Sequence, residues 1–287
     1  MIHTKLQKPK INISTDKNYK TVKKMVQESY LNTVCAEARC PNIYECWNRK
    51  TATLMILGDT CTRACGFCSV KTGKPTWNDP LEPIRVAQAV KKMGLRHVVI
   101  TSVDRDDLKG YFGASIWADT IKQTKKVNPG CTVEVLTPDF KGFEPALKIV
   151  FDSKPDIFSH NVECVERISK AVRAQANWQR SLGVLEKSIQ HGLRTKTGIM
   201  VGLGEEVEEV KKTMRQVVDL GVQIFTIGQY LQPTKNHLKV EEYISKEQFE
   251  LYKEYGYSVG FKVVESGPLV RSSYHADEQA RMVFNNG

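Results

Sequence analysis

The sequence predicts an α/β fold, a partial (β/α)6 barrel of the TIM type. From residue 51 onward, short apolar runs rich in β-branched residues alternate with amphipathic helical stretches, and six such pairs follow one another. Strands separated by helices form right-handed parallel βαβ units. The chain has 287 residues, 41% of them hydrophobic, which is enough for one barrel domain with a full core.

Helix boundaries are marked by residues that favour a start or a stop. The first barrel helix begins after Pro83 and ends before Gly94. The turn at residues 128–130 ends the second, and Gly192 and Gly221 follow two later helices. The predicted strands are 51–57, 97–103, 132–136, 156–160, 196–201 and 223–230. The predicted helices are 84–93, 117–127, 144–151, 165–174, 182–191, 206–220 and 246–257.

Three segments are expected along the chain. Residues 1–50 form an N-terminal extension, lysine-rich from Lys5 to Lys24 and short on apolar periodicity, followed by a loop-like stretch with cysteines. Residues 51–262 form the barrel, and residues 263–287 form a C-terminal segment. Active sites of such barrels lie where the strands' carboxyl ends meet the following loops.

The formal net charge of +10 allows three interpretations. Nucleic-acid binding is one, a solvated basic surface is another, and a docking face for an acidic protein is the third. No aromatic-rich motif interleaves with the lysines, which disfavours nucleic acid. No apolar run approaches the ~20 residues of a membrane helix, and the N-terminus lacks the features of a secretory signal. We therefore expect a cytoplasmic protein without a membrane or nucleic-acid partner.

Six of the eight cysteines lie between Cys35 and Cys68. In a reducing compartment such clustering indicates metal or redox chemistry rather than disulfides. Cys61, Cys65 and Cys68 follow the first predicted strand with C-x3-C-x2-C spacing. A tetrahedral zinc site needs four ligands. Three thiolates can instead bind three irons of a [4Fe–4S] cluster and leave the fourth iron open.

This loop, with the aromatic Phe67 before its last cysteine, resembles the signature of the radical S-adenosylmethionine (SAM) superfamily. The resemblance implies that the open iron chelates SAM, and that one electron cleaves the sulfonium to a 5′-deoxyadenosyl radical while the protein orients the cofactor. SAM contacts are expected in blocks that follow the predicted strands. The candidate residues are Phe67, Thr101, Asp104, Asn161, Glu163 and Arg173.

Cys35, Cys40 and Cys46 form a second set with C-x4-C-x5-C spacing. Alone, this spacing would also suit a zinc site or a redox pair. Beside the radical SAM loop it resembles the auxiliary-cluster motif of the lipoyl synthase family. Residues 271–276, Arg-Ser-Ser-Tyr-His-Ala, resemble that family's closing motif, whose serine is the fourth ligand of the auxiliary [4Fe–4S] cluster. We assign this role to Ser273, with Ser272 as the alternative, and so expect the tail to return to the barrel mouth.

The resemblance implies insertion of two sulfur atoms, at C6 and C8, into octanoyl-lysine on a carrier protein, with the auxiliary cluster as sulfur donor. The implied carriers are the lipoyl domains of 2-oxoacid dehydrogenases and the glycine-cleavage carrier protein. An electron donor such as ferredoxin or flavodoxin and an iron–sulfur cluster carrier are further expected partners, and the enzyme is expected to be a monomer. Two alternatives stay open: another sulfur-inserting or methylthiolating radical SAM enzyme, and a zinc module that binds nucleic acid.

Overall fold

The structure is a computed structural model that describes residues 9–11, 13–29, 31–49 and 52–285. Within these residues the main sheet has eight strands in the order β1-β2-β5-β6-β7-β8-β9-β10. Neighbouring strands are parallel except at the edge, where β1 is antiparallel to β2. The strands are β1 (Asn32–Thr33), β2 (Thr53–Ile56), β5 (His97–Ser102), β6 (Thr132–Leu136), β7 (Ile157–Ser159), β8 (Thr195–Val201), β9 (Ile224–Gln229) and β10 (Val263–Gly267).

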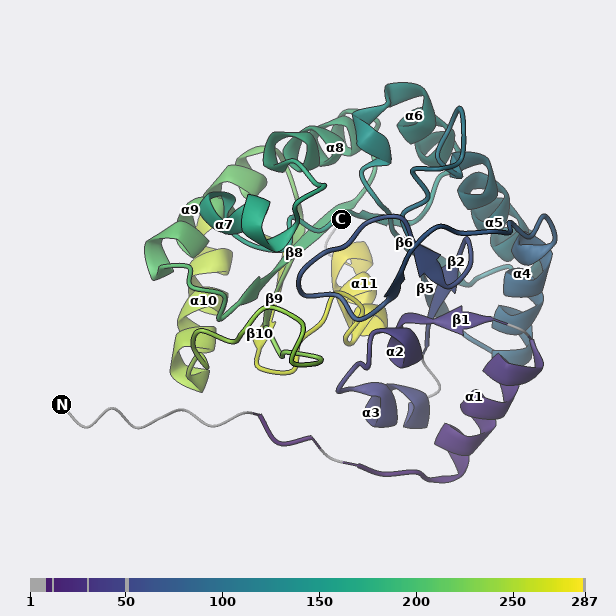
Figure 1. Ribbon diagram of the computed structural model, residues 1–287, viewed down its shortest axis with the longest axis horizontal. Coiled ribbons are helices and arrows are strands. Elements are labelled where there is room, and N and C mark those ends of the chain that lie inside the picture. The colour runs from purple at the N-terminus through teal and green to yellow at the C-terminus, as the bar shows by residue number, and fades with distance from the viewer. Residues whose placement is uncertain (1–8, 12, 30, 50–51, 286–287) are drawn as a thin grey trace.

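The helices between these strands form an arc around the outside of the sheet (Figure 1). They are α4 (Glu82–Met93), α5 (Ala114–Val127), α6 (Glu144–Asp152), α7 (Glu166–Val172), α8 (Trp178–Gln190), α9 (Val207–Asp219) and α10 (Lys246–Val259). Six βα units therefore follow one another and the predicted partial barrel is confirmed. A further parallel strand, β10, follows the sixth unit.

The helix ends follow the local signals of the sequence. Gly94 caps α4 with φ 63°, and Gly260 caps α10 with φ 113°, backbone conformations that glycine adopts without strain. Helix α9 begins with a capping box in which Glu206 and Glu209 each bind the other's backbone N–H. These caps explain why the predicted helix limits lie close to the observed ones.

The barrel interior contains a buried ion pair beneath the carboxyl ends of the strands. Lys196 Nζ lies 2.8 Å from Glu134 Oε1, and both side chains are fully buried. His97 Nε2 lies 3.5 Å from the other Glu134 oxygen. Burial disfavours ionisation of Glu134, but Lys196 and His97 outweigh it and hold the pKa of this carboxyl below its usual range. The strands therefore carry charged residues on the inside, and apolar residues pack under the outer helices.

Residues 17–28 form a helix, α1 (Lys17–Glu28), where the sequence indicated little apolar periodicity. Its apolar stripe is narrow, because Val22 and Val26 are its two buried residues. Asp16 accepts backbone hydrogen bonds at its start, and Tyr19 stacks on Tyr44 at 5.4 Å between ring centroids. The cysteine stretch, expected to be loop-like, contains the short helices α2 (Val34–Glu37) and α3 (Ile43–Asn48). Residues 50 and 51, the proposed start of the barrel domain, lie outside the described residues.

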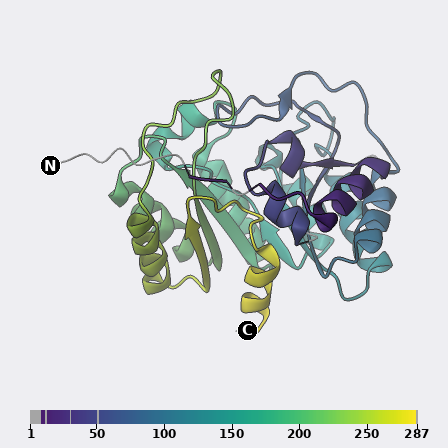
Figure 2. The same cartoon turned by 90° about the horizontal axis from the view of Figure 1, so that it is seen from below.

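The C-terminal tail crosses the barrel from one end to the other. The carbonyl oxygen of Val270 lies so close to Gly228 in β9 that a Cβ there would be 2.1 Å away. Beyond it, α11 (Ala276–Asn285) lies inside the arc of outer helices (Figures 1 and 2). Its Ala280 and Val283 pack with Ile157, Ile224 and Val263, near the amino ends of three strands. The tail thus passes the barrel mouth and closes the opposite end.

No helix among the described residues is long and apolar enough to span a membrane.

Candidate functional site

The loop that carries Cys61, Cys65 and Cys68, the first cysteine set, is held by hydrogen bonds from three sides. Cys61 ends β3 (Thr60–Cys61), which pairs with β4 (Lys71–Thr72). The backbone N–H of Thr62 donates to the Asp104 carbonyl, and that of Gly66 donates to the Val172 carbonyl, each at 2.9 Å. The Leu238 N–H donates to the Gly66 carbonyl, also at 2.9 Å. The segments that follow β5 and β9, together with the last residue of α7, therefore set the path of this loop.

Gly66 is required by the close approach of the segment after β9. A Cβ at this position would lie 2.8 Å from Leu238 Cγ. His237 Nε2 lies 2.9 Å from the Cys68 carbonyl oxygen, so the same segment covers the loop at a second point. Sequence reasoning missed His237 and Leu238, because neither residue type is specific and both lie far along the chain.

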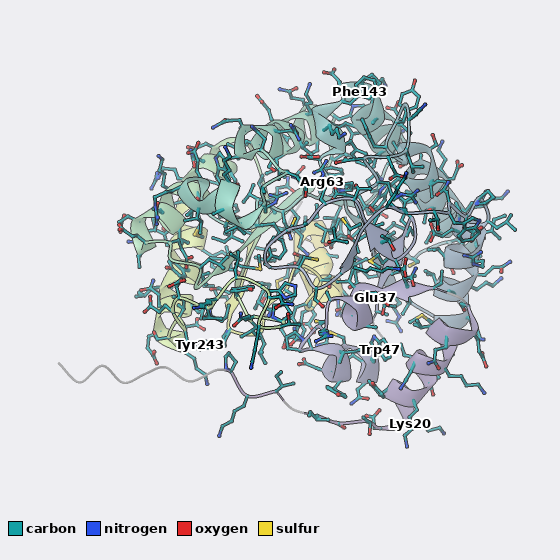
Figure 3. All side chains as sticks on the ribbon, in the orientation of Figure 1. Lys20, Glu37, Trp47, Arg63, Phe143 and Tyr243 are labelled. Carbon is teal, nitrogen blue, oxygen red and sulfur yellow. The ribbon has the colours of Figure 1, made fainter. Side chains whose placement is uncertain are left out.

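Arg63 lies between Cys61 and Cys65 and forms several buried ion pairs. The sequence analysis did not identify it. Its side chain is 4% exposed and lies 2.8 Å from Asp106, 2.7 Å from Asp139 and 3.3 Å from Asp104. Burial opposes its charge, but these carboxylates raise the pKa of Arg63 above its ordinary value. Figure 3 shows Arg63 near the centre of the barrel mouth. Two features of the sequence could have indicated these ion pairs: an arginine inside the cysteine loop, and the acidic run at 104–107.

We expect Arg63→Gln to lower the free energy of unfolding by about 3 kcal/mol, because it leaves buried carboxylates without their main cation. Arg180 still lies 3.1 Å from Asp139, which limits the loss. Urea unfolding of the reconstituted chain measures this. The control is Arg167→Gln, which removes a 55% exposed arginine from Glu209 and should cost less than about 1 kcal/mol. Equal losses in the two variants would contradict the role of Arg63.

The thiols of the first set suit a metal cluster rather than free thiolates. Burial raises the pKa of Cys65 to about 12, opposed by the charge of Arg173. Burial likewise raises the pKa of Cys68 to about 11, and it raises that of Cys61. Bound iron replaces the thiol proton and removes this penalty. Three half-buried thiols on one glycine-containing loop therefore fit three irons of a [4Fe–4S] cluster.

The loop after β7 brings three of the candidate SAM residues together. Arg173 Nη1 donates to the carbonyls of Asn161 and Val162 at 3.2 and 3.1 Å. Asn161 Nδ2 donates to Glu163 Oε1 at 3.3 Å, and Glu163 has φ 68°, a strained backbone for a non-glycine residue. The Oδ1 atom of Asn161 is buried without a hydrogen-bond partner, and it lies beside Gly198. An unpartnered buried acceptor next to a glycine suits a ligand hydroxyl.

Of the other candidate SAM residues, Asp104 and Phe67 lie at the first cysteine set, whereas Thr101 is bonded within the sheet. Asp104 lies next to the cysteine loop, where its Oδ2 is 3.9 Å from Cys61 Sγ, and burial raises its pKa to about 6. Thr101 is buried in β5, and its hydroxyl donates to the Leu136 carbonyl at 2.9 Å, so it is occupied within the sheet. Phe67 is half-buried on the loop itself. Asp104, Glu163 and Arg173 all act electrostatically on Cys65, which places these three around the first cysteine set.

The second cysteine set lies on α2 and α3, beside the C-terminal tail. Cys35 is buried on α2, Cys40 follows that helix, and Cys46 lies on α3. Burial, and secondarily the neighbouring Cys40, raises the pKa of Cys35 to about 11. Cys35 and Cys46 line one pocket together with Thr53 and Ser273. The fold therefore brings Ser273 beside Cys35 and Cys46, although it lies near the other end of the sequence.

The two adjacent serines of the tail face different partners. Ser273 Oγ accepts a hydrogen bond from Thr53 Oγ1 at 2.7 Å, inside the pocket of Cys35 and Cys46. Ser272 Oγ accepts a hydrogen bond from Asn161 Nδ2 at 2.5 Å, on the side of the first set. Thr53, the partner of Ser273, was missed by sequence reasoning because nothing local distinguishes it from other strand threonines.

Among the described residues, no three His, Cys, Asp or Glu side chains are close enough together to hold a single metal ion. A [4Fe–4S] cluster does not need such a set, since each of its thiolates binds a different iron.

Comparison with known proteins identifies the family. The sequence model of the radical SAM superfamily matches residues 55–217. The lipoyl synthase of Rubrobacter xylanophilus is 56% identical over 272 residues, covering 94% of this chain and 84% of that relative. The lipoyl synthase of Oceanobacillus iheyensis is 53% identical, covering 96% and 90%. The mitochondrial lipoyl synthase of Nematostella vectensis is 51% identical, covering 94% of each.

Solved structures agree on the fold. Streptococcus suis SuiB bound to S-adenosylmethionine superposes with a TM-score of 0.60 at 11% identity, covering 90% of this chain and 58% of SuiB. Methylornithine synthase (PylB) superposes with a TM-score of 0.56 at 11% identity, covering 90% and 79%. The match to the superfamily model and the identities above 50% together settle the assignment. The chain belongs to the lipoyl synthase family of the radical S-adenosylmethionine superfamily.

Proposed function

We propose that this chain inserts sulfur at C6 and C8 of an octanoyl chain carried on a lysine, and that a second, auxiliary [4Fe–4S] cluster donates the sulfur. Membership of the lipoyl synthase family makes the chain a radical SAM sulfur-inserting enzyme with a [4Fe–4S] cluster and SAM as cofactors. The observation that supports the proposal of a second cluster is that two members of the second cysteine set, Cys35 and Cys46, share a pocket with Ser273 of the tail.

The proposed ligands divide the two clusters between two regions of the chain. Cys61, Cys65 and Cys68 would hold the first cluster, which with SAM would supply the radical chemistry that hydrogen removal from the acyl chain needs. The auxiliary cluster is held by Cys35, Cys40, Cys46 and Ser273. An oxygen ligand binds iron more weakly than a thiolate, so Ser273 suits the corner at which a cluster opens to release sulfur. The hydrogen bond from Thr53 supports Ser273 over Ser272.

The loop after β7 and its neighbours are the proposed SAM site. The unpartnered Asn161 Oδ1 would accept a hydrogen bond from a ligand hydroxyl, and Arg173 fixes the backbone that carries it. Glu163 and Asp104 supply carboxylates near the first cluster. The contacts of Thr101 support a role in positioning β5 rather than in touching SAM. Phe67 would pack against the first cluster.

Iron and acid-labile sulfide analysis of the anaerobically reconstituted chain tests the second cluster. We expect about eight irons and about eight sulfides per chain, the content of two [4Fe–4S] clusters. About four irons and about four sulfides per chain would mean a single [4Fe–4S] cluster, and would contradict the proposed auxiliary cluster. Zinc in place of iron would favour the zinc alternative, and a methylthio group on a product would favour a methylthiolating enzyme. Membership of the lipoyl synthase family favours neither alternative.

The partners follow from the family's substrate. Lipoyl-carrier proteins are the acyl carriers on which the enzyme acts, and we propose the lipoyl domains of 2-oxoacid dehydrogenases and the glycine-cleavage carrier protein as the individual ones. We further propose ferredoxin or flavodoxin as electron donor, an iron–sulfur carrier that rebuilds the auxiliary cluster, and a monomeric enzyme. The cytoplasm remains the proposed compartment, on the grounds of reduced, clustered cysteines.

Carrier docking is expected to be electrostatic, because the chain has a net charge of +10. On α1, Lys17, Lys20 and Lys23 are exposed and form no ion pair within the described part of the chain; Lys20 lies at the outer edge of the molecule in Figure 3. The apparent affinity for an acidic octanoyl-carrier should fall as salt rises, mainly through the association rate. Stopped-flow binding at low and high salt measures this. An affinity that does not depend on salt would indicate apolar docking.

A further inference from the structure

A polar network joins the C-terminal tail to α3 next to Ser273. Arg49, the residue that caps α3, lies 2.5 Å from Glu278 and 3.6 Å from Asp277 in the first turn of α11. Arg49 Nη1 is also 2.8 Å from His275 Nε2. From α3 itself, Glu45 accepts a hydrogen bond from the Tyr274 hydroxyl at 3.1 Å and lies 3.0 Å from His275. We call Glu45, Arg49, His275, Asp277 and Glu278 the tail clamp.

The clamp acts on a short stretch between two apolar anchors. Upstream, Val270 is buried beside Gly228. Downstream, Ala280 and Val283 of α11 are 2% and 1% exposed, so α11 stays in place by apolar packing. Residues 271–275 between these anchors are only half-buried; their side chains form hydrogen bonds and ion pairs, and Tyr274 stacks on His275. The position of Ser273 is therefore set by polar contacts and not by core packing.

Within the tail clamp, Arg49 connects the end of α3 to the first turn of α11. It lies three residues after Cys46 and reaches the carboxylates four and five residues beyond Ser273. The side chains of Arg49 and Glu278 are 33% and 39% exposed, and pairs of that exposure are weak and screened by salt. A weak polar tie can hold the serine near the cluster ligands and still let it move, which a buried apolar contact could not.

We propose that Arg49 is a positioning residue for the auxiliary site: it ties α3, with Cys46, to the tail, with Ser273, so that the serine stays at the cluster and returns to it after detaching. The inference rests on the proposed auxiliary cluster. Arg49 touches neither substrate nor iron in this role. It acts by keeping residues 271–275 close to α3.

The test compares the reconstituted full-length chain with Arg49→Gln, Glu278→Gln and the charge exchange Arg49→Glu/Glu278→Arg. The control is Arg167→Gln, which breaks a surface pair with Glu209 between α7 and α9, away from the tail. Amide hydrogen exchange of residues 271–285 is measured in the cluster-free and the reconstituted chain. Release of iron to a chelator is followed in time, and formation of 5′-deoxyadenosine is measured separately.

We expect Arg49→Gln and Glu278→Gln to speed exchange in residues 271–275 and release of the auxiliary iron by roughly three- to tenfold, with 5′-deoxyadenosine formation unchanged. The charge exchange should bring both rates below those of the two single variants, but not back to the wild-type rates, because a carboxylate at position 49 also faces Asp277. Rates in both single variants equal to those of Arg167→Gln would overturn the clamp. If the wild-type chain held only one cluster, the proposed auxiliary cluster would fail, and hydrogen exchange of the cluster-free chain would still decide whether Arg49 holds the tail.

Discussion

Cys65→Ala is expected to abolish reductive cleavage of SAM while the chain keeps about half of its iron. In the proposed arrangement each cysteine of the first set binds one iron, so loss of one thiolate would remove that cluster and its open iron site. The second set lies on α2 and α3, on different elements from the first loop, and should load independently. The measurements are iron content after anaerobic reconstitution and the yield of 5′-deoxyadenosine with a chemical reductant.

Cys40→Ala is the matched variant in the second set. It should also keep about half of the iron, cleave SAM at a near-normal rate, and form no product with sulfur inserted. Cys131→Ala, at a buried cysteine outside both sets, controls for the loss of any thiol. Loss of SAM cleavage in a folded Cys40→Ala chain would show that the two sets do not have separate roles.

Ser273→Ala should retain SAM cleavage but fail to complete two sulfur insertions, because the proposed auxiliary cluster would lack its fourth protein ligand. Ser273→Cys should hold that cluster more firmly and release sulfide poorly, since iron prefers thiolate to an alkoxide ligand. The measurement is mass spectrometry of the carrier, scored as products with one and with two sulfur atoms per auxiliary cluster present at the start.

Ser272→Ala is the control for this pair. Its hydroxyl bonds Asn161 and not the pocket of Cys35 and Cys46, so this variant should keep the auxiliary cluster and both insertions. Full double insertion by Ser273→Ala, together with its loss in Ser272→Ala, would move the ligand to Ser272. Full activity in both variants would leave the tail with a structural role alone.

The barrel could be predicted because its signals are local. Each βα unit has its own apolar periodicity and its own start and stop signals, such as Pro83 in the first turn of α4 and Gly94 at its end. Helix α1 was not predicted, because two valines make too narrow a stripe to be recognised among lysines. Strand β10 was not predicted either; it is five residues long, and it is buried by elements far from its own sequence, since Val263 packs with α11 and Val264 with the cluster that contains α10.

The candidate site was predictable as far as its chemistry depends on spacing. Both cysteine sets are short motifs, and the structure keeps each set on one stretch of backbone. The partners of those motifs come from far along the chain: Asp139 for Arg63, Thr53 for Ser273, and Glu278 for Arg49. Such contacts depend on how strands and tail are arranged in space, which no local pattern records.

The most direct test of the auxiliary cluster as sulfur source uses heavy-isotope sulfide. The chain is reconstituted with iron and labelled sulfide, separated from excess reagents, and incubated anaerobically with an octanoylated carrier, SAM and reductant. Mass spectrometry of the carrier should show two labelled sulfur atoms in place of two hydrogens, at no more than one lipoyl group per chain. Unlabelled sulfur in the product, or SAM cleavage that leaves the octanoyl group unchanged, would contradict sulfur donation by the cluster of Cys35, Cys40, Cys46 and Ser273.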